Sequence, residues 1–290
     1  MDYTLNIKGR LVDLSEPLVM GILNVTPDSF YAASRQQTEA DIAARANQIT
    51  DEGGAMIDIG ACSTRPGGEP ATEAEEMERL RQALAIVRRE QPDCVISVDT
   101  FRPDVARMAV EEFGADIIND VGDPSSITYH PSSLTTEQQT MFRMVAKLGV
   151  PYIYMSSKPT LREILLDFAE SVQQLRDMGQ KDIILDPGFG FGKTLEQNYE
   201  VLRELERLQV MELPMLVGLS RKSMIYKLLG GTPADVLNGT TALNTIALMK
   251  GASILRVHDV REAVECCRLV RQLKPLTSHL SPLTSNFKPQ

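Results

Sequence analysis

The stretch Ile183-Ile184-Leu185-Asp186-Pro187-Gly188-Phe189-Gly190-Phe191-Gly192-Lys193 is where the fold of this chain first becomes readable. Its first three residues form a short apolar run, which predicts a buried strand that ends in a carboxylate. The glycines that follow permit tight turns, so the backbone there can lie close to a ligand. A plain glycine-rich turn with a solvated Asp186 fits this stretch equally well. The choice therefore depends on how the other strands of the chain end.

Spacing excludes two common phosphate-binding loops from this stretch. The Walker pattern requires glycine at the position of Pro187, and the dinucleotide-binding pattern requires glycine at the position of Lys193. We therefore expect no nucleotide-phosphate loop here.

Apolar runs followed by polar residues recur along the chain, and most are separated from the next by a segment typical of a helix. The runs, predicted to be strands, are residues 19–23, 56–60, 95–98, 116–118, 152–155, 183–185, 215–219 and 254–257. Near-continuous apolar strands are characteristic of parallel sheets. Eight strand–helix units in about 250 residues predict a (β/α)8 TIM barrel, an α/β fold. A doubly wound open sheet is the alternative, because a count of strands does not establish closure.

Capping signals predict the starts of two of the helices. Thr38 and Asp41 predict a start near residue 38, and Thr72 with Glu75 predicts a helix from about residue 72 to about residue 90. Further helices are expected from about residue 103, over residues 138–148 and 161–178, and after residue 259.

Two segments outside the repeated units form the ends of the chain. Residues 3–7 and 11–14 alternate around Lys8-Gly9, which predicts a short N-terminal β-hairpin. Proline and serine are frequent after residue 274, a composition typical of a frayed tail. We therefore expect a single barrel domain over residues 1–275 and a C-terminal tail over residues 276–290.

Composition restricts the class of protein. The chain has 290 residues, of which 43% are hydrophobic and 24% are charged, and its formal net charge is −9. An acidic chain is not expected to bind nucleic acid, and no apolar run is long enough to span a membrane. The cysteines show no metal-ligand spacing and no signal peptide precedes them, so we expect reduced thiols in a cytoplasmic protein.

Polar residues gather at the predicted C-terminal ends of the strands, where (β/α)8 barrels hold their active sites. These residues are Asn24, Asp58, Asp99, Asn119, Asp120, Asp186, Lys222, Arg256 and His258. For Asp58 and Asp120 we favour a capping or structural role. The other acceptors of the set suit a planar ligand with several N–H donors, and Lys222 supplies a donor to a nearby carbonyl.

Other members of this set suit an anion. Arg256 and His258 lie two residues apart, so they share a strand face, and with Asn24 they come from the eighth and first strands. Barrels usually hold phosphate near this point. The turn-rich segment 63–68 follows a strand, and its Arg65 is interpreted as a contact to an anionic ligand. The sequence thus predicts a heterocycle site beside an anion site.

Taken together, these motifs resemble those of the dihydropteroate synthase family. The matching segments follow the family order and lie at residues 20–30, 63–67, 97–100, 118–120, 185–193, 220–223 and 256–259. The resemblance implies a (β/α)8 fold and a transferase reaction of folate biosynthesis. In that reaction 6-hydroxymethyl-7,8-dihydropterin pyrophosphate condenses with 4-aminobenzoate, giving dihydropteroate and pyrophosphate. It also implies Mg²⁺ as a cofactor, a homodimer and a target of sulfonamides.

The resemblance further assigns roles to individual residues. Those implied to hold the pterin are Asp99, Asn119, Asp186 and Lys222, with Met155 and Phe191 against its face. Those implied to hold the pyrophosphate are Asn24, Arg256 and His258, with Mg²⁺ at Asn24. Those implied to meet the aminobenzoate are Thr64, Arg65, Pro66 and Ser223, with Phe30 on the neighbouring loop. The implied catalytic residues are Lys222, Arg256, His258 and Arg65.

The sequence also departs from the family pattern, which keeps two alternatives open. Ala32 replaces a usual Asp, Ala61-Cys62 replaces a usual Gly-Glu, and residues 155–159 differ from the family's Met-His-Met type of run. One alternative is a weakly active or non-catalytic pterin-binding paralogue. The other is a methyltetrahydrofolate–corrinoid methyltransferase, which would need neither the segment at residues 63–67 nor Ser220-Arg221-Lys222.

Overall fold

The computed structural model describes residues 3–25, 35–62, 71–122 and 136–273. Within these residues, eight parallel strands form one sheet in the order β8-β7-β6-β5-β4-β3-β10-β9. They are β3 (Leu18–Asn24), β4 (Met56–Gly60), β5 (Val95–Asp99), β6 (Ile117–Asp120), β7 (Tyr152–Met155), β8 (Ile183–Asp186), β9 (Leu216–Val217) and β10 (Ile254–Val257).

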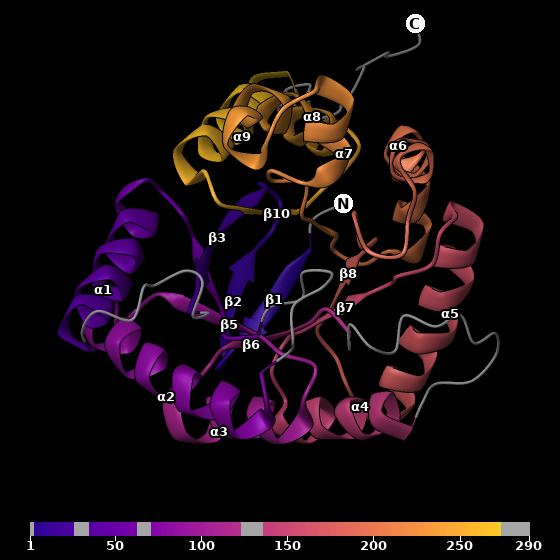
Figure 1. The fold of residues 1–290 in the computed structure, drawn as a ribbon. Helices are drawn as coiled ribbons and strands as arrows, with labels where there is room; N and C mark the ends of the chain where they lie inside the picture. The colour runs from indigo at the N-terminus through magenta and orange to yellow at the C-terminus, as the bar shows by residue number, and fades with distance from the viewer. Residues whose placement is uncertain (1–2, 26–34, 63–70, 123–135, 274–290) are drawn as a thin grey trace, which may run out of the picture.

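The two ends of this strand order meet and close the barrel. A parallel bridge joins Leu185 on β8 to Met215, the residue before β9. The Leu185 N–H also donates to the carbonyl of Pro214 at 2.9 Å. The predicted (β/α)8 barrel is therefore confirmed, and the open sheet is excluded (Figure 1).

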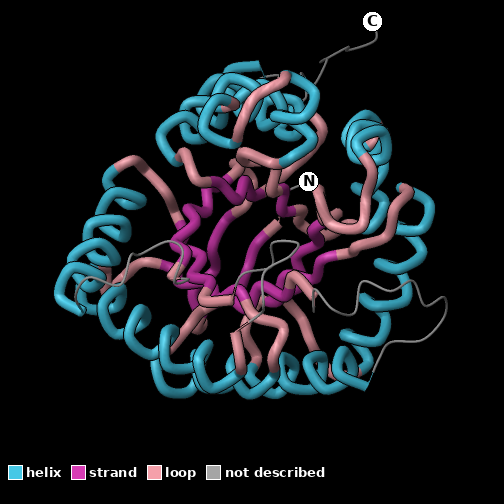
Figure 2. Tube along the Cα trace, in the orientation of Figure 1, coloured by secondary structure: helices cyan, strands magenta, loops and turns pink. Residues whose placement is uncertain are grey.

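Helices connect the strands and surround the barrel, as Figure 2 shows. They are α1 (Arg35–Asp51), α2 (Glu73–Glu90), α3 (Pro103–Phe113), α4 (Thr136–Leu148), α5 (Leu161–Asp177), α6 (Leu195–Arg203), α7 (Ser223–Leu229), α8 (Leu237–Met249) and α9 (Val260–Leu273), with 3-10 helices at η2 (Leu205–Met211) and η3 (Pro233–Asp235). Their buried faces pack against outward-facing strand residues in one apolar cluster, which includes Ile57, Leu80 and Val98.

The start of α2 agrees with its prediction, whereas the start of α1 does not. The Thr72 hydroxyl accepts from the Glu75 N–H at 3.3 Å, and the Glu75 carboxylate accepts from the Thr72 N–H at 2.9 Å, which completes a capping box. Helix α1 begins at Arg35, so the predicted start near Thr38 was wrong. Arg and Gln are good helix formers, and residues 35–37 extend the helix ahead of the expected cap.

The predicted N-terminal hairpin is present. Strand β1 (Thr4–Ile7) pairs antiparallel with β2 (Arg10–Asp13). Lys8 and Gly9, between the strands, have φ values of 51° and 82°. Positive φ at both central residues is typical of a two-residue hairpin turn, and glycine adopts it without a steric penalty.

This hairpin covers the N-terminal end of the barrel. Leu5 and Ile7, with Leu14, pack in one cluster with buried residues near the strand starts, namely Met20, Met56, Ile117, Ile153, Ile184, Leu216 and Ile254. Burying each such side chain stabilises the fold by about 1.5–3 kcal/mol. The N-terminal half of the barrel interior is therefore apolar core.

Toward the C-terminal ends, the barrel interior becomes polar. Side chains alternate along a strand, so Met56 is followed on the same face by Asp58, and Ile254 by Arg256. The polar positions lie at the end of the barrel where the sequence predicts the site.

No helix within the described residues is long and apolar enough to cross a membrane. The tail expected over residues 276–290 lies outside the described residues.

Candidate active site

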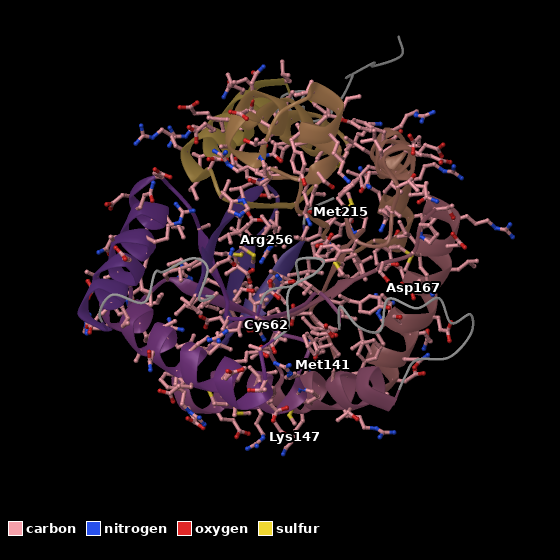
Figure 3. The ribbon with its side chains drawn as sticks, viewed as in Figure 1. Cys62, Met141, Lys147, Asp167, Met215 and Arg256 are labelled. Atoms are coloured by element: carbon pink, nitrogen blue, oxygen red, sulfur yellow. The ribbon has the colours of Figure 1, made fainter. Side chains whose placement is uncertain are left out.

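Arg256 on β10 is the central cation of the site and lies inside the ring of strands (Figure 3). Its Nε donates to Asp58 Oδ2 at 2.6 Å, and its Nη2 donates to Asp99 Oδ2 at 2.7 Å. Burial lowers the pKa of Arg256, but Asp58 and Asp99 outweigh burial and raise it above its usual range. Arg256 is therefore a permanent positive charge held by β4 and β5.

Asp58 on β4 joins its own strand to three others through its buried carboxylate. Besides Arg256, it accepts from Ser97 Oγ at 2.6 Å and from Asn119 Nδ2 at 3.2 Å. A helix-capping role does not apply, because Asp58 lies in the middle of β4. The signal in the sequence is a charged residue within an otherwise apolar strand, since such a residue must find a partner when buried.

Asp120 has hydrogen bonds of a structural kind. Its carboxylate accepts from Tyr152 Oη at 2.6 Å and from the Gly122 N–H at 2.8 Å. Tyr152 is a buried core residue of the neighbouring strand β7, and Gly122 follows Asp120 by two residues. These contacts agree with the structural role expected for Asp120.

Asn119 presents an unpaired acceptor. Its side chain is buried, and its Oδ1 has no hydrogen-bond partner among the described residues. The orientation of the amide follows from Asp58, because only Nδ2 can donate to that carboxylate. A buried acceptor without a partner costs about 1–3 kcal/mol, so this oxygen is suited to an N–H donor from a ligand.

The glycine-rich segment after β8 folds back onto Asp186. Asp186 Oδ1 accepts from the Gly188 N–H at 2.8 Å. Gly188 has a φ of 66°, and a Cβ there would lie 2.3 Å from the carbonyl oxygen of Ser156, so the position requires glycine. Burial raises the pKa of Asp186, while the Gly188 hydrogen bond and the Lys222 ammonium oppose that rise.

Lys193 holds this segment in place, a role that the sequence pattern did not indicate. Its Nζ donates to the carbonyls of Gly188 at 2.9 Å, Phe191 at 3.2 Å and Ser156 at 3.3 Å. Burial lowers the pKa of Lys193 to about 8, although Asp186 opposes the change. One ammonium thus joins the loop after β8 to the end of β7.

Lys222 lies over the ring of Phe191. Its Nζ is 4.1 Å from the ring centroid, within the range of a cation–π interaction. Burial lowers the pKa of Lys222 to about 8, an effect that Asp186 opposes and Arg256 reinforces. Asp99 also acts on the pKa of Lys222, so these predicted site residues lie close enough to influence one another's charge.

Met155 and Ser223 lie at the edges of this group. Met155 is the register partner of Asp186 on the neighbouring strand, and its Cγ would lie 3.1 Å from a Cβ at Gly188. Ser223 is the first residue of α7, directly after Lys222. Both residues lie at the C-terminal end of the barrel, as the other predicted site residues of the described segments do.

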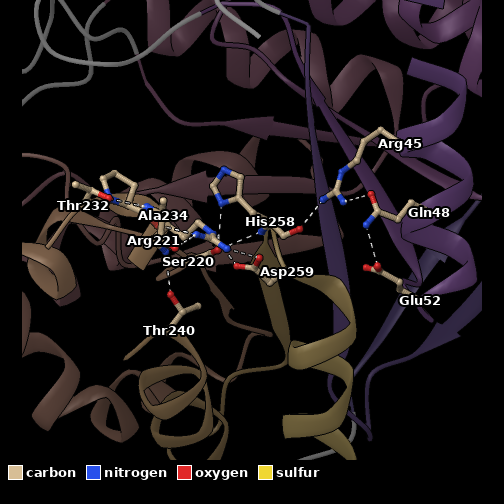
Figure 4. A network of polar contacts seen from close by, with 11 residues as sticks. Arg45, Gln48, Glu52, Ser220, Arg221, Thr232, Ala234, Thr240, His258 and Asp259 are labelled. Atoms are coloured by element: carbon tan, nitrogen blue, oxygen red, sulfur yellow. Dashed lines mark hydrogen bonds and ion pairs between the residues drawn. The ribbon is translucent and has the colours of Figure 1, made fainter. Parts of the chain in front are cut away.

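His258, directly after β10, is fixed by the network in Figure 4. Its backbone N–H donates to Ser220 Oγ at 3.1 Å, and its Nδ1 lies 3.1 Å from the same oxygen. Arg45 Nη2 donates to the His258 carbonyl at 2.6 Å. Burial, reinforced by Arg256, lowers the pKa of His258 to about 4, so the ring is neutral near pH 7. His258 is therefore a hydrogen-bonding group rather than a second cation.

Arg221 aligns the two turns that carry these residues. Its Nε and Nη2 donate to the two carboxylate oxygens of Asp259 at 2.9 and 2.7 Å, and its N–H donates to Thr240 Oγ1 at 3.1 Å. Bidentate pairs of this kind restrict geometry as well as distance. Arg221 thereby ties the turn with Ser220 and Lys222 to the start of α9.

Asn24, at the end of β3, is the residue expected to bind Mg²⁺. A Cβ at Gly60 would lie 3.4 Å from Asn24 Oδ1 and 3.6 Å from Asp99 Oδ2, so Gly60 leaves room between two oxygens. Mg²⁺ prefers oxygen ligands and commonly takes only one or two from the protein, with the rest from water and substrate phosphate. Among the described residues no cluster of three or more His, Cys, Asp or Glu could hold a metal ion.

The remaining predicted site residues, Phe30, Thr64, Arg65 and Pro66, lie outside the described residues. Thr64, Arg65 and Pro66 belong to the segment of residues 63–70, and the residues on both sides of this segment are described. Arginines bind the backbone on each side. Arg79 Nη1 donates to the Ala61 carbonyl at 3.1 Å, and Arg102 Nη2 donates to the Ala71 carbonyl at 2.6 Å. Arg102 also forms an ion pair with the buried Glu76 of α2.

Comparison with known proteins identifies the family. The family model described as pterin binding enzyme matches residues 20–258. The dihydropteroate synthase of Escherichia coli (strain K12) is 38% identical over 276 residues, covering 91% of this chain and 94% of that protein. This chain belongs to the dihydropteroate synthase family.

Solved structures of the family have the same fold. The Xanthomonas albilineans dihydropteroate synthase with 4-aminobenzoic acid has a TM-score of 0.84 at 32% identity, covering 95% of this chain and 100% of that one. The Yersinia pestis dihydropteroate synthase with a sulfonamide drug complex has a TM-score of 0.80 at 35% identity, covering 93% and 98%. The family resemblance is therefore confirmed, while the roles of individual residues stay predictions.

Proposed function

We propose that this chain condenses 6-hydroxymethyl-7,8-dihydropterin pyrophosphate with 4-aminobenzoate to form dihydropteroate and pyrophosphate. Membership of the dihydropteroate synthase family supports the proposal. The observation that carries it is the buried Asn119 Oδ1, which has no partner among the described residues. A pterin presents several N–H donors along one edge, and such a donor would satisfy this oxygen.

The pterin is proposed to lie among Asp99, Asn119, Asp186 and Lys222. Asp186 and Asn119 supply acceptors, and Lys222 supplies a donor to the ring carbonyl. Met155 and Phe191 supply the apolar walls.

The anion is proposed to lie at Arg256 and His258. The C–O bond between the pterin methylene carbon and pyrophosphate breaks, and its electron pair leaves with the pyrophosphate. The amine of 4-aminobenzoate forms the new C–N bond and releases a proton to solvent. Because the electron-rich dihydropterin stabilises the methylene carbon, no protein nucleophile is needed.

The permanent charge of Arg256 and an N–H from neutral His258 stabilise the leaving group, as preorganised groups do. Arg65 is proposed to act from its loop, with Thr64, Pro66 and Phe30 around the aminobenzoate and Ser223 nearby.

Mg²⁺ is proposed to bind at Asn24, with substrate oxygens completing its ligands. When bound, it supplies positive charge that stabilises the departing pyrophosphate. Removal of the metal with a chelator is expected to lower turnover while leaving thermal unfolding unchanged, since few protein ligands contribute.

A product assay tests the proposal. The purified chain is incubated with both substrates and Mg²⁺, and dihydropteroate is measured by chromatography. Sulfonamides are expected to slow its formation in competition with 4-aminobenzoate. Pterin binding without product would identify the non-catalytic paralogue. Methyl transfer from methyltetrahydrofolate to a corrinoid would identify the methyltransferase.

A homodimer is proposed to form through the outer face of α7 and α8. Helix α8 has no charged residue and leaves Ile246 and Met249 exposed, and α7 leaves Leu228 and Leu229 exposed. A helix that is apolar on more than one face usually packs against a partner. Ile246→Glu is expected to yield monomers in sedimentation, whereas Leu11→Glu, at an exposed residue of the hairpin, should leave the dimer intact.

A cytoplasmic location is also proposed, with small molecules rather than nucleic acid or membrane as ligands. The four cysteines are free thiols, as expected in a reducing compartment.

A further inference from the structure

We propose that Ser220 is a positioning residue that keeps the imidazole proton of His258 on Nε2, so that the ring presents an N–H to the anionic leaving group. The inference rests on the proposed placement of pyrophosphate at His258. The family resemblance assigned no role to Ser220.

Two hydrogen bonds between the same residues carry the inference. The His258 backbone N–H donates to Ser220 Oγ at 3.1 Å, which uses one lone pair of the hydroxyl. The Ser220 Oγ also lies 3.1 Å from His258 Nδ1. Among the described residues, Nδ1 is the only acceptor within reach of the Ser220 hydroxyl proton. The hydroxyl therefore donates to Nδ1, which must carry a lone pair, and the proton of the neutral ring lies on Nε2.

The surrounding contacts keep this pair in register. Ser220 is only 5% exposed, so water competes little for its hydroxyl. The next residue, Arg221, is bound to Asp259, and Asp259 follows His258 directly. Arg45 holds the His258 carbonyl from the other side. Figure 4 shows these contacts on both sides of the His258 ring.

The tautomer matters because the two forms present opposite groups to an anion. A ring protonated on Nδ1 presents the Nε2 lone pair, which repels a phosphate oxygen. A ring protonated on Nε2 donates to that oxygen. Burial and Arg256 lower the pKa of His258 to about 4, so the ring is neutral near pH 7 and carries a single N–H proton. Which of its two nitrogens carries that proton therefore decides what the ring presents to the anion. Ser220 provides the selection.

Nitrogen NMR of the full chain with ¹⁵N-labelled histidine tests the assignment. The sequence has three histidines, His130, His258 and His279, and the His258→Gln variant identifies the His258 signals by their loss. The wild type is expected to show His258 protonated on Nε2 and bare on Nδ1. Ser220→Ala should produce a mixture of tautomers, and Ser220→Thr, which keeps the hydroxyl, should restore the wild-type pattern. Thr240→Val removes a hydroxyl from the same network without touching His258, and should leave the pattern unchanged.

Kinetics supply the second readout. Ser220→Ala is expected to lower kcat at least about tenfold, short of the roughly 10²- to 10³-fold loss caused by removing such a donor outright. The affinity for a pterin without pyrophosphate should stay within twofold of wild type, and Ser220→Thr should recover most of kcat.

Three results would overturn the proposal: a wild-type His258 protonated on Nδ1, a tautomer unchanged in Ser220→Ala, or a changed tautomer with unchanged kcat. If the wild type forms no dihydropteroate, the proposed function fails instead. The NMR spectra then still decide the Ser220–His258 assignment, because they do not depend on turnover.

Discussion

Asp58 Oδ2 accepts a hydrogen bond of 2.6 Å from Nε of Arg256, a residue 198 positions later in the chain. The pair joins β4 to β10 across the barrel interior, and Arg256 extends the contact to Asp99 at 2.7 Å. The cation proposed to meet the leaving group is thus oriented by two carboxylates before any substrate binds.

Asp58→Asn is expected to destabilise the protein by about 1–3 kcal/mol, because Arg256 keeps Asp99 but the buried hydrogen bonds to the Asp58 carboxylate are weakened or lost. Urea unfolding measures the change. Asp104→Asn removes an exposed i,i+3 pair with Arg107 and should change stability by less than about 1 kcal/mol. Equal effects of the two variants would show that the Asp58–Arg256 pair has no special role.

Asp186 is expected to be the main anchor of the pterin. Asp186→Ala should weaken pterin binding in calorimetry by at least about 1–3 kcal/mol, since the ligand's donors lose a buried acceptor. Asp186→Asn serves as the comparison, because its Oδ1 can still accept from the Gly188 N–H and preserve the loop. If both variants bind pterin like the wild type, the anchor lies elsewhere.

His258 and Arg256 are expected to respond differently to replacement by alanine. His258→Ala should reduce turnover with the pyrophosphate substrate and scarcely alter binding of a plain pterin. Arg256→Ala should impair both, because Asp58 and Asp99 lose their shared partner. Turnover assays and calorimetry separate the two patterns. An equal loss of plain pterin binding in both variants would mean that His258 shapes the pocket rather than contacting the anion.

The ion pair of Arg102 with Glu76 is expected to support the aminobenzoate site through Ala71. Glu76→Gln should raise KM for 4-aminobenzoate several-fold while leaving pterin affinity unchanged, because Arg102 would hold the Ala71 carbonyl less firmly. Arg81→Gln breaks an exposed pair with Glu112 that joins α2 to α3, close in sequence to the Glu76–Arg102 pair, and should leave both constants unchanged. A matching rise in KM for both variants would point to general loosening of these helices.

Pterin affinity is expected to fall as pH rises through about 8. The folded-state pKa of Lys222 is about 8, below its ordinary value of 10.5, so the ammonium is lost in this range. The stability of the fold changes with pH in the opposite direction from pterin affinity, because a deprotonated Lys222 no longer costs the free energy of burying a charge. This contribution to stability is fully present above about pH 10.5 and is lost as pH falls through 8. Calorimetry between pH 7 and 10 measures how pterin affinity changes with pH, and this fall in affinity should be absent in Lys222→Arg. A slope that persists would belong to Lys193, whose pKa is also about 8.

Much of the architecture follows from local sequence. Apolar runs of strand length, the Lys8-Gly9 turn and the Thr72–Glu75 capping box depend on residues a few positions apart, so their pattern is visible in the chain. The polar residues at the strand ends were predictable for the same reason, because the period of a strand and the direction of a parallel sheet determine where they lie. The start of α1 was misplaced, since helix-forming residues before Thr38 continue the helix.

What the tertiary structure alone decided is which of these side chains meet. Asp58 was expected to be a cap or structural residue. The pairing and register of the neighbouring strands from β10 through β3, β4 and β5 to β6 bring it to Ser97, Asn119 and Arg256. The Ser156 carbonyl that binds Lys193 and the Ser220 hydroxyl on His258 likewise come from segments far from their partners in the chain. Local propensity cannot specify such partners, because they depend on the stagger of all the strands around a closed barrel.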